Sequence, residues 1–370
     1  MCPKLRVMLL STDLEKGGLP LRLVRLAKHL HTVDVEPIVG CLARRGPLNE
    51  RLTSLGITNF SCDAVGPFDV RCLGRLARWV RALDPDLIHS SLFHANLATR
   101  LIGRLDRQRP LLTSTVTIET RRRWHLALEA LTCDRSDLHV ANSEAVARHL
   151  RQDVGLSPDR LMVIPNGLDL AEIERVSPAR RDALGLRRDV PLIVWAGRMD
   201  PVKNLETVID AVEKMNRQRA VQLLLLGDGP QRSTIETRVA MRGLQSSVHF
   251  AGWSENVIGW LKTADLLLLP SWTEGSPNVV LEAMACGCPV VASDVPGCRE
   301  LITQGETGRL CCSGNVQGFV REVLGLLDDV ALRRRLSERA LRCIRRGHDI
   351  QDVVVRWRSA YDRLISQRSP

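Results

Sequence analysis

The sequence predicts an α/β protein built from two doubly wound domains, each with a parallel sheet. Short apolar runs alternate with stretches in which apolar residues recur at helical spacing, and this alternation favours parallel sheets covered by helices on both faces. The scheme occurs twice, before and after a polar, basic stretch at residues 176–191. A chain of 370 residues is long enough for two domains that each bury a core.

Each predicted element follows from a local pattern. We expect strands at residues 5–10, 35–39, 87–89, 111–116, 138–141, 192–195, 221–226, 248–250, 266–269 and 289–292, and helices at 74–83, 95–104, 205–216, 231–242, 278–286 and 353–364. The predicted domains are residues 1–175 and 176–350, followed by a terminal segment at 351–370. Because doubly wound sheets bind ligands at the carboxyl ends of their strands, we expect an active site in a cleft between the two domains.

Composition excludes several classes of protein. The net charge is +10, but aromatic residues are only 4% of the chain and no basic stripe is interleaved with them, which disfavours nucleic-acid binding. An anionic membrane surface or phosphorylated substrates suit this charge better. No apolar run reaches the length of a membrane span, and the apolar start predicts a first strand rather than a signal peptide. The eleven cysteines are scattered, without Cys-x-x-Cys pairs, so we expect a cytoplasmic protein without a zinc site.

Two glutamates, Glu274 and Glu282, are the most informative feature of the sequence. Glu274 follows the strand predicted at 266–269, and Glu282 lies about one turn inside the next helix. The first backbone N–H groups of a helix lack intrahelical partners and carry the positive end of its dipole. A phosphate would fit there, with one carboxylate on each side. The alternative is that both glutamates are solvated surface charges.

The segment 273–293 resembles the E-x7-E segment of the retaining glycosyltransferases of family 4, which have the two-domain GT-B fold. The resemblance implies transfer of a hexose-type sugar from a nucleotide-diphosphate donor, such as a UDP- or GDP-sugar, to an acceptor hydroxyl, with retention of configuration. It also implies that no bound metal or other cofactor is needed. The first domain would bind the acceptor and the second the donor, and the terminal helix would return to the first domain.

Arg198 and Lys203, in the loop after the strand at 192–195, match the family's contacts to the donor diphosphate. Two cations at the carboxyl end of a strand would clamp a diphosphate, and they would stabilise the charge that grows on it as it leaves. The resemblance places Glu282 on the ribose hydroxyls and Glu274 near the donor sugar, where it either stabilises an oxocarbenium-like state or orients hydroxyls. The donor-binding residues implied are Gly17, Gly18, Arg198, Lys203, Ser276, Asn278, Val279 and Glu282.

A histidine near the sugar is expected from the segment after the strand at 87–89. Family members often carry His-x-His here, whereas this chain has His89 and Ser91, with His94 one turn further on. We favour His94 as the residue that meets the sugar, and a helix-capping or core role is the alternative. Many relatives have Thr-Val-His where this chain has Thr115-Val116-Thr117, so its acceptor side differs from theirs. With this choice the predicted catalytic residues are Glu274, His94, Arg198 and Lys203.

Other functions remain open on the same scaffold: a sugar-nucleotide 2-epimerase, a sugar-phosphate synthase, or a non-catalytic binding protein. A dehydrogenase is disfavoured because no Gly-x-Gly-x-x-Gly follows a strand. Phosphate-binding cations argue against glycoside hydrolysis by the two carboxylates.

Family members that build surface polysaccharides often use lipid-linked acceptors. Here three consecutive arginines, Arg121 to Arg123, precede Trp124 and then Leu126, Leu128 and Leu131. This pattern suits the anionic inner face of a membrane, so we expect a cytoplasmic enzyme that associates peripherally with it. A solvated basic turn is the alternative.

Overall fold

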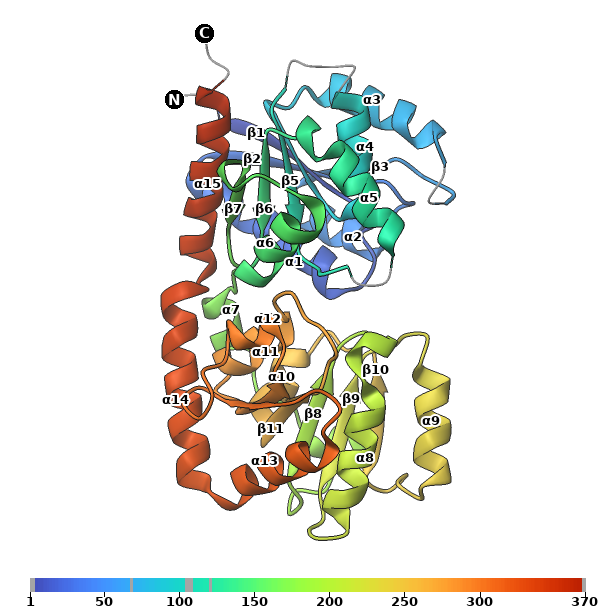
Figure 1. The fold of residues 1–370 in the computed structure, drawn as a ribbon, viewed down its shortest axis with the longest axis vertical. Helices are drawn as coiled ribbons and strands as arrows, with labels where there is room; N and C mark the ends of the chain where they lie inside the picture. The colour runs from blue at the N-terminus through green and yellow to red at the C-terminus, as the bar shows by residue number, and fades with distance from the viewer. Residues whose placement is uncertain (1–3, 67–68, 104–108, 120–121, 368–370) are drawn as a thin grey trace. The chain divides into compact units, whose positions relative to one another are not determined.

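The computed structural model describes residues 4–66, 69–103, 109–119 and 122–367. The chain forms two compact units, one of residues 1–167 together with 350–370 and the other of residues 168–349. Each unit contains one sheet whose strands all pair in parallel (Figure 1). The predicted α/β class with two doubly wound domains is therefore confirmed.

The first unit has a seven-stranded sheet with the order β3-β2-β1-β4-β5-β6-β7. Its strands are β1 (Leu5–Ser11), β2 (Val35–Cys41), β3 (Thr58–Ser61), β4 (Leu87–Ser91), β5 (Leu111–Thr115), β6 (Leu138–Ala141) and β7 (Leu161–Val163). The two edge strands, β3 and β7, were not predicted, because each is short and β3 contains a single large apolar residue, Phe60. The order of the strands reverses between β1 and β4, so the loops after these strands diverge at the carboxyl edge of the sheet.

Helices cover both faces of this sheet (Figure 1). They are α1 (Gly18–Leu30), α2 (Pro47–Ser54), α3 (Arg71–Leu83), α4 (Phe93–Gly103), α5 (Arg123–Thr132), α6 (Glu144–His149) and α15 (Ile350–Ser366), with short helical turns at His31–Val33, Cys133–Arg135, Leu150–Val154 and Pro158–Arg160. Helix α4 begins two residues before its predicted start, which places His94 in its first turn. Helix α5 was not predicted.

The C-terminal helix α15 packs on the first unit, as expected. Its apolar side joins the core formed by β1, β2 and α1, and Trp357 and Tyr361 are both buried. The ring of His89 on β4 stacks on Trp357 with a centroid distance of 4.5 Å, and its Nδ1 lies 2.9 Å from the Tyr361 hydroxyl. This terminal helix therefore closes the core beside β4.

The second unit has a six-stranded sheet with the order β10-β9-β8-β11-β12-β13. Its strands are β8 (Leu192–Ala196), β9 (Gln222–Leu226), β10 (Val248–Gly252), β11 (Leu266–Leu269), β12 (Val290–Ser293) and β13 (Arg309–Cys311). Strands β8 and β11 are fully apolar and buried, as expected for central parallel strands. The order reverses between β8 and β11, so the loops that follow these two strands diverge at the sheet's carboxyl edge.

The helices of the second unit are α7 (Leu170–Arg175), α8 (Leu205–Asn216), α9 (Arg232–Met241), α10 (Val257–Thr263), α11 (Asn278–Ala285), α12 (Pro296–Arg299), α13 (Val316–Asp328) and α14 (Val330–Gly347), with short helical turns at Arg181–Leu184 and Pro201–Lys203. Helix α8 has the predicted bounds. Within the described residues, no helix is long and apolar enough to cross a membrane.

Candidate active site

The loops after β8 and β11 bring together two of the predicted site residues, Lys203 and Glu274. Lys203 Nζ lies 2.7 Å from Glu274 Oε1. The Glu274 side chain is only 8% exposed and that of Lys203 is 24% exposed. A carboxylate this deeply buried needs a charged partner, and Lys203 provides it. The ion pair therefore joins a predicted diphosphate contact to a predicted sugar contact.

Backbone and side-chain hydrogen bonds hold the two loops against each other. The Trp272 backbone N–H donates to the Val202 carbonyl at 2.8 Å, and Asn204 Nδ2 donates to the Pro270 carbonyl at 3.1 Å. Asn204 has a left-handed backbone with φ of 52°, which Asn tolerates better than most residues. These contacts bracket Lys203 and fix its side chain beside Glu274.

Arg198 lies in the same loop as Lys203 but extends into solvent. Its side chain is 73% exposed, and its Nε lies 2.9 Å from Asp200 Oδ2. An exposed guanidinium that keeps most of its N–H donors available is well placed to bind an anion.

The loop that carries Arg198 packs on the turn after β9. The Gly197 N–H donates to the Leu226 carbonyl and the Met199 N–H to the Asp228 carbonyl, at 3.0 and 2.9 Å. Gly227 has φ of 132°, and a Cβ there would lie 1.9 Å from the Gly197 carbonyl oxygen. The turn at residues 227–230 thus packs directly against the loop that carries Arg198.

The Glu274 loop is supported in a similar way by α12. A Cβ at Gly297 would lie 2.4 Å from the Glu274 carbonyl oxygen. Helix α11 begins after Pro277, which gives it no side-chain cap, and Glu282 lies one turn inside it. The predicted donor residues Ser276, Asn278, Val279 and Glu282 are all half-buried at this end of the helix.

The two glycines predicted to approach the donor, Gly17 and Gly18, stand where α1 begins in the first unit. Gly17 is the N-cap residue, in an extended conformation without a side-chain cap, and its carbonyl accepts from the Leu21 N–H at 3.1 Å. Gly18 is exposed. This glycine pair therefore leaves little side-chain bulk at the start of the helix.

The structure separates the two candidate histidines. His89 is fully buried between Tyr361 and Ser114, whose Oγ lies 3.1 Å from His89 Nε2, and burial lowers its pKa to about 3. It is a neutral core residue. His94 is half-buried on α4, with its ring edge-on to Phe93 and His125 at centroid distances of 5.2 and 5.6 Å. Burial, and then the charge of Arg122, lowers the pKa of His94.

Three features of these sites were not predicted from the sequence. One is Asp200, which orients Arg198. Another is the direct pairing of Lys203 with Glu274, although opposite charges after two neighbouring strands could have suggested it. The third is His125 on α5, which is buried and stacked on Phe93. Among the described residues, no cluster of three His, Cys, Asp or Glu side chains has the arrangement of a metal site.

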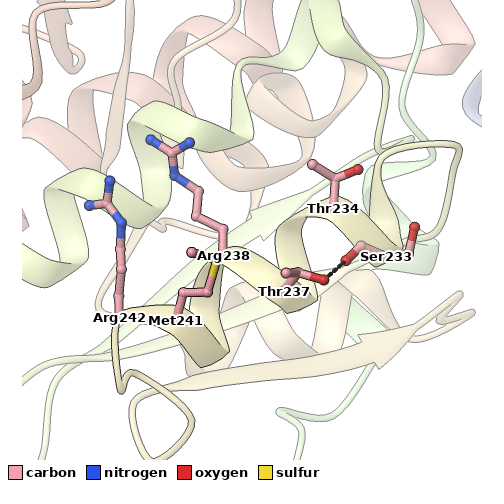
Figure 2. A pocket seen from close by; sticks show the side chains of 6 residues that line it. All are labelled: Ser233, Thr234, Thr237, Arg238, Met241 and Arg242. Atoms are coloured by element: carbon pink, nitrogen blue, oxygen red, sulfur yellow. Dashed lines mark hydrogen bonds between the residues drawn. The ribbon is translucent and has the colours of Figure 1, made fainter.

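A depression on the second unit lies away from these loops, along α9 (Figure 2). Its arginines already have partners: Arg238 contacts Asp210 at 2.9 Å, and Arg242 contacts the same carboxylate at 2.8 Å. Their charge is therefore neutralised within the protein, and one helix provides the whole lining. We do not assign a function to it.

The two parallel-sheet units, with their loops at the carboxyl edges of the sheets, have a fold of the GT-B type. In agreement, the family model "Glycosyltransferase Family 4" matches residues 16–172, and the model "Glycosyl transferases group 1" matches residues 190–329. The chain belongs to glycosyltransferase family 4, and it is a glycosyltransferase.

Two curated relatives illustrate the similarity. The chain is 27% identical to the N-acetyl-alpha-D-glucosaminyl L-malate synthase of Bacillus anthracis over 312 residues. The aligned region covers 82% of each protein. It is 31% identical over 204 residues to the lipopolysaccharide core biosynthesis glycosyltransferase LpsE of Rhizobium meliloti, covering 55% of this chain and 58% of LpsE.

Solved structures share the fold. Anabaena Alr3699/HepE in complex with UDP and glucose superposes with a TM-score of 0.88 at 22% identity, over 97% of this chain and 100% of that one. The sucrose-phosphate synthase of Thermosynechococcus elongatus superposes with a TM-score of 0.84 at 20% identity, over 98% and 100%.

The packing of Gly227 against Gly197 yields a testable prediction. In Gly227→Ala, the new methyl group displaces the Arg198 loop, and misplacing a substrate-binding group by about 1 Å can cost about 100-fold in rate. We expect kcat/KM for the sugar-nucleotide donor to fall about 10- to 100-fold, measured by release of the nucleotide. Gly325→Ala is the control, because that glycine lies in α13 with open space around its Cα. A Gly227→Ala enzyme that melts like the wild type and has wild-type kinetics would contradict the prediction that the Arg198 loop binds the donor.

Proposed function

We propose that this glycosyltransferase is retaining and metal-independent, and that it moves a hexose-type sugar from a nucleotide-diphosphate donor to an acceptor hydroxyl in the synthesis of a surface polysaccharide or glycolipid. The observation that carries the proposal is the Lys203–Glu274 ion pair beside the exposed Arg198. In this proposal, the second unit holds the donor.

The electrostatics of the site support this role. As the bond from the sugar to the diphosphate breaks, negative charge grows on the leaving group, and fixed cations that stabilise this charge lower the barrier. Arg198 supplies several N–H donors, and Lys203 supplies a point charge held in place by Glu274. Glu282 is suited to accept hydrogen bonds from ribose hydroxyls. Glu274, once the diphosphate attracts Lys203, is left with a carboxylate oxygen for the donor sugar.

Relatives supply the substrate classes. Crystal structures of Anabaena Alr3699/HepE contain UDP or UDP-glucose, which favours a UDP-sugar over a GDP-sugar as the donor here. LpsE of Rhizobium meliloti is named for lipopolysaccharide core biosynthesis, which favours a cell-surface product. We assign the acceptor to the first unit.

A lipid-linked acceptor at a membrane surface is also part of the proposal, and the surface of α5 supports it. This helix buries its polar residues His125, Glu129 and Thr132, whereas the apolar residues Trp124, Ala127 and Leu131 are exposed. Trp124 is 47% exposed and Leu131 is 75% exposed. Trp124, Ala127 and Leu131 are spaced three and four residues apart, so they lie on one side of the helix. Such a face, with apolar residues one turn apart, suits the interfacial region of a bilayer.

Charge on the same side of the first unit fits an anionic surface. Arg122 and Arg123 are exposed at the start of α5, whereas Arg121 lies outside the described residues. Helix α4 lies between α5 and α3 (Figure 1), and α3 carries Arg78 and Arg81 on its exposed side without any acidic residue. Basic residues near a membrane with anionic lipids are attracted to it, and salt screens this attraction.

The donor site is tested by removing its cations. Arg198→Ala and Lys203→Ala should each lower turnover of UDP-glucose about 100-fold or more, because each loses a contact that strengthens as the leaving group ionises. Nucleotide release is measured across a panel of UDP- and GDP-sugars, with and without EDTA. Arg187→Ala is the control, since Arg187 pairs with Asp189 on the surface at 2.6 Å. Wild-type rates in the double variant with every donor would refute the donor site.

Membrane association is tested by sedimentation with vesicles that contain phosphatidylglycerol. The wild type should bind at low salt and dissociate at high salt, and Arg122→Gln/Arg123→Gln should reduce binding about tenfold. Trp124→Ser/Leu131→Ser should reduce binding at both salt concentrations. Met241→Ser, which removes an exposed apolar side chain from the second unit, serves as control. If the wild type fails to bind, or the α5 variants bind like it, the acceptor is not reached through this surface.

A further inference from the structure

The first unit contains a cavity on the inner side of α5, at the carboxyl ends of β4 and β5. Its wall includes Phe93 and Asn96 of α4, Thr115 at the end of β5, His125 and Glu129 of α5, and His149 of α6. Ligands of doubly wound sheets bind at this edge, beyond the carboxyl ends of the strands. The cavity therefore lies where the fold places ligands, and its wall combines apolar and polar side chains.

His125 is the group in this wall whose hydrogen bonding is incomplete. Its side chain is buried, with only 5% of the residue exposed, and its ring stacks on Phe93 at a centroid distance of 3.8 Å. Nδ1 faces Glu119 Oε2 at 3.6 Å, whereas Nε2 has no hydrogen-bond partner among the described residues. Buried polar atoms in folded proteins are almost always paired, so an orphaned Nε2 indicates a partner that the protein itself does not supply.

Several other polar side chains of the wall already have partners. Arg100 Nη2 donates to Glu129 Oε1 at 2.6 Å. Asn96 accepts from Ser90 Oγ and donates to the Ser114 carbonyl, and His149 Nδ1 lies 2.7 Å from Asp153 Oδ2. A molecule that enters the cavity would supply the missing partner without breaking these contacts.

The backbone beside His125 is strained. Leu92, at the junction of β4 and α4, lines the cavity and has φ of 76°, a conformation that is rare for a bulky residue without a polar side chain. Such strain persists only where the surrounding structure enforces it, and it is common at binding sites. This observation supports the cavity as a built site.

The chemistry of His125 defines the partner's class. Burial, then Arg122 and His94, lowers the pKa of His125, while Glu119 and Glu129 oppose the shift, so the imidazole is neutral near pH 7. In the tautomer whose Nδ1 proton is directed at the Glu119 carboxylate, Nε2 carries a lone pair and accepts a hydrogen bond. A neutral donor such as a hydroxyl group satisfies it.

We propose that this cavity is the acceptor's hydroxyl subsite and that His125 Nε2 accepts a hydrogen bond from a hydroxyl group of the acceptor. The inference rests on the proposed function, since it assigns a ligand contact to the unit that receives the acceptor. It gives His125 the contact with the acceptor and leaves the half-buried His94 outside this cavity wall. Thr117, which stands where many relatives have histidine, also lines the cavity, so His125 supplies an imidazole from α5 in a site that lacks one there.

The test measures binding of three hydroxyl-bearing probes, myo-inositol, methyl α-D-glucoside and L-malate, by saturation-transfer NMR in the presence of UDP. His125→Leu removes the acceptor atom, and His125→Gln restores an acceptor oxygen near the position of Nε2. His139→Gln is the control, because His139 is buried in the same unit, outside this wall, and pairs with Thr113 and the Cys133 carbonyl. We expect at least one probe to bind the wild type, to bind His125→Leu at least tenfold more weakly, and to bind His125→Gln and His139→Gln within about threefold of the wild type.

Two results would overturn the inference: no probe binds the wild type, which would leave a cavity filled by water only, or His125→Leu binds the probes like the wild type. Hydrolysis of UDP-glucose, measured on the same samples, separates the two proposals. If hydrolysis is intact while His125→Leu has no effect on the probes, the subsite is wrong and the donor site stands. If wild-type enzyme turns over no sugar nucleotide, the proposed function fails first.

Discussion

The proposed donor site depends on one electrostatic constraint: the buried carboxylate of Glu274 must be neutralised. Removing one partner of a buried ion pair costs about 3–5 kcal/mol, so the contact with Lys203 at 2.7 Å constrains both loops that carry these residues. The order of the strands puts those loops side by side, because β8 and β11 are neighbours although about 70 residues separate them in the chain. In the proposed function, the same pair that holds the loops together would place a cation beside the leaving diphosphate.

Two glycines allow other parts of the second unit to pack closely against the loops that carry these charged residues. The turn after β9 approaches the Arg198 loop so closely that no Cβ fits at Gly227, and α12 approaches the Glu274 loop equally closely at Gly297. The loops that carry the charged side chains therefore pack backbone against backbone, and this packing restricts the positions of those side chains. In the first unit, by contrast, side chains form the candidate site: Phe93, His125 and Leu92 line a cavity whose wall combines apolar and polar groups. The two candidate sites therefore differ in how their side chains are positioned.

Much of the fold could be predicted from periodicity, and the failures have physical causes. Central strands such as β11 are continuous apolar runs, and α8 shows a clear helical period, so both matched their predicted bounds. Strands β3 and β13 are short and contain both polar and apolar residues. Each forms because it pairs with a neighbouring strand, and this long-range pairing cannot be predicted from the local sequence. Helix α5 was missed because its buried side is polar and its apolar side is exposed. His125 lacked any motif; its orphaned nitrogen and the cavity beside it appear only when α4, β5 and α5 are assembled.

The most direct test of the account is a double-mutant cycle between Lys203 and Glu274, measured as kcat/KM for UDP-glucose. Lys203→Met and Glu274→Gln keep the size of each side chain and remove its charge. If the pair acts as one unit in the donor site, each single variant loses most of the activity and the double variant is little worse, giving a coupling free energy of about 1 kcal/mol or more. Effects that add to within about 0.5 kcal/mol, or single variants with wild-type kcat/KM, would show that the ion pair only supports the fold and that the donor is bound elsewhere.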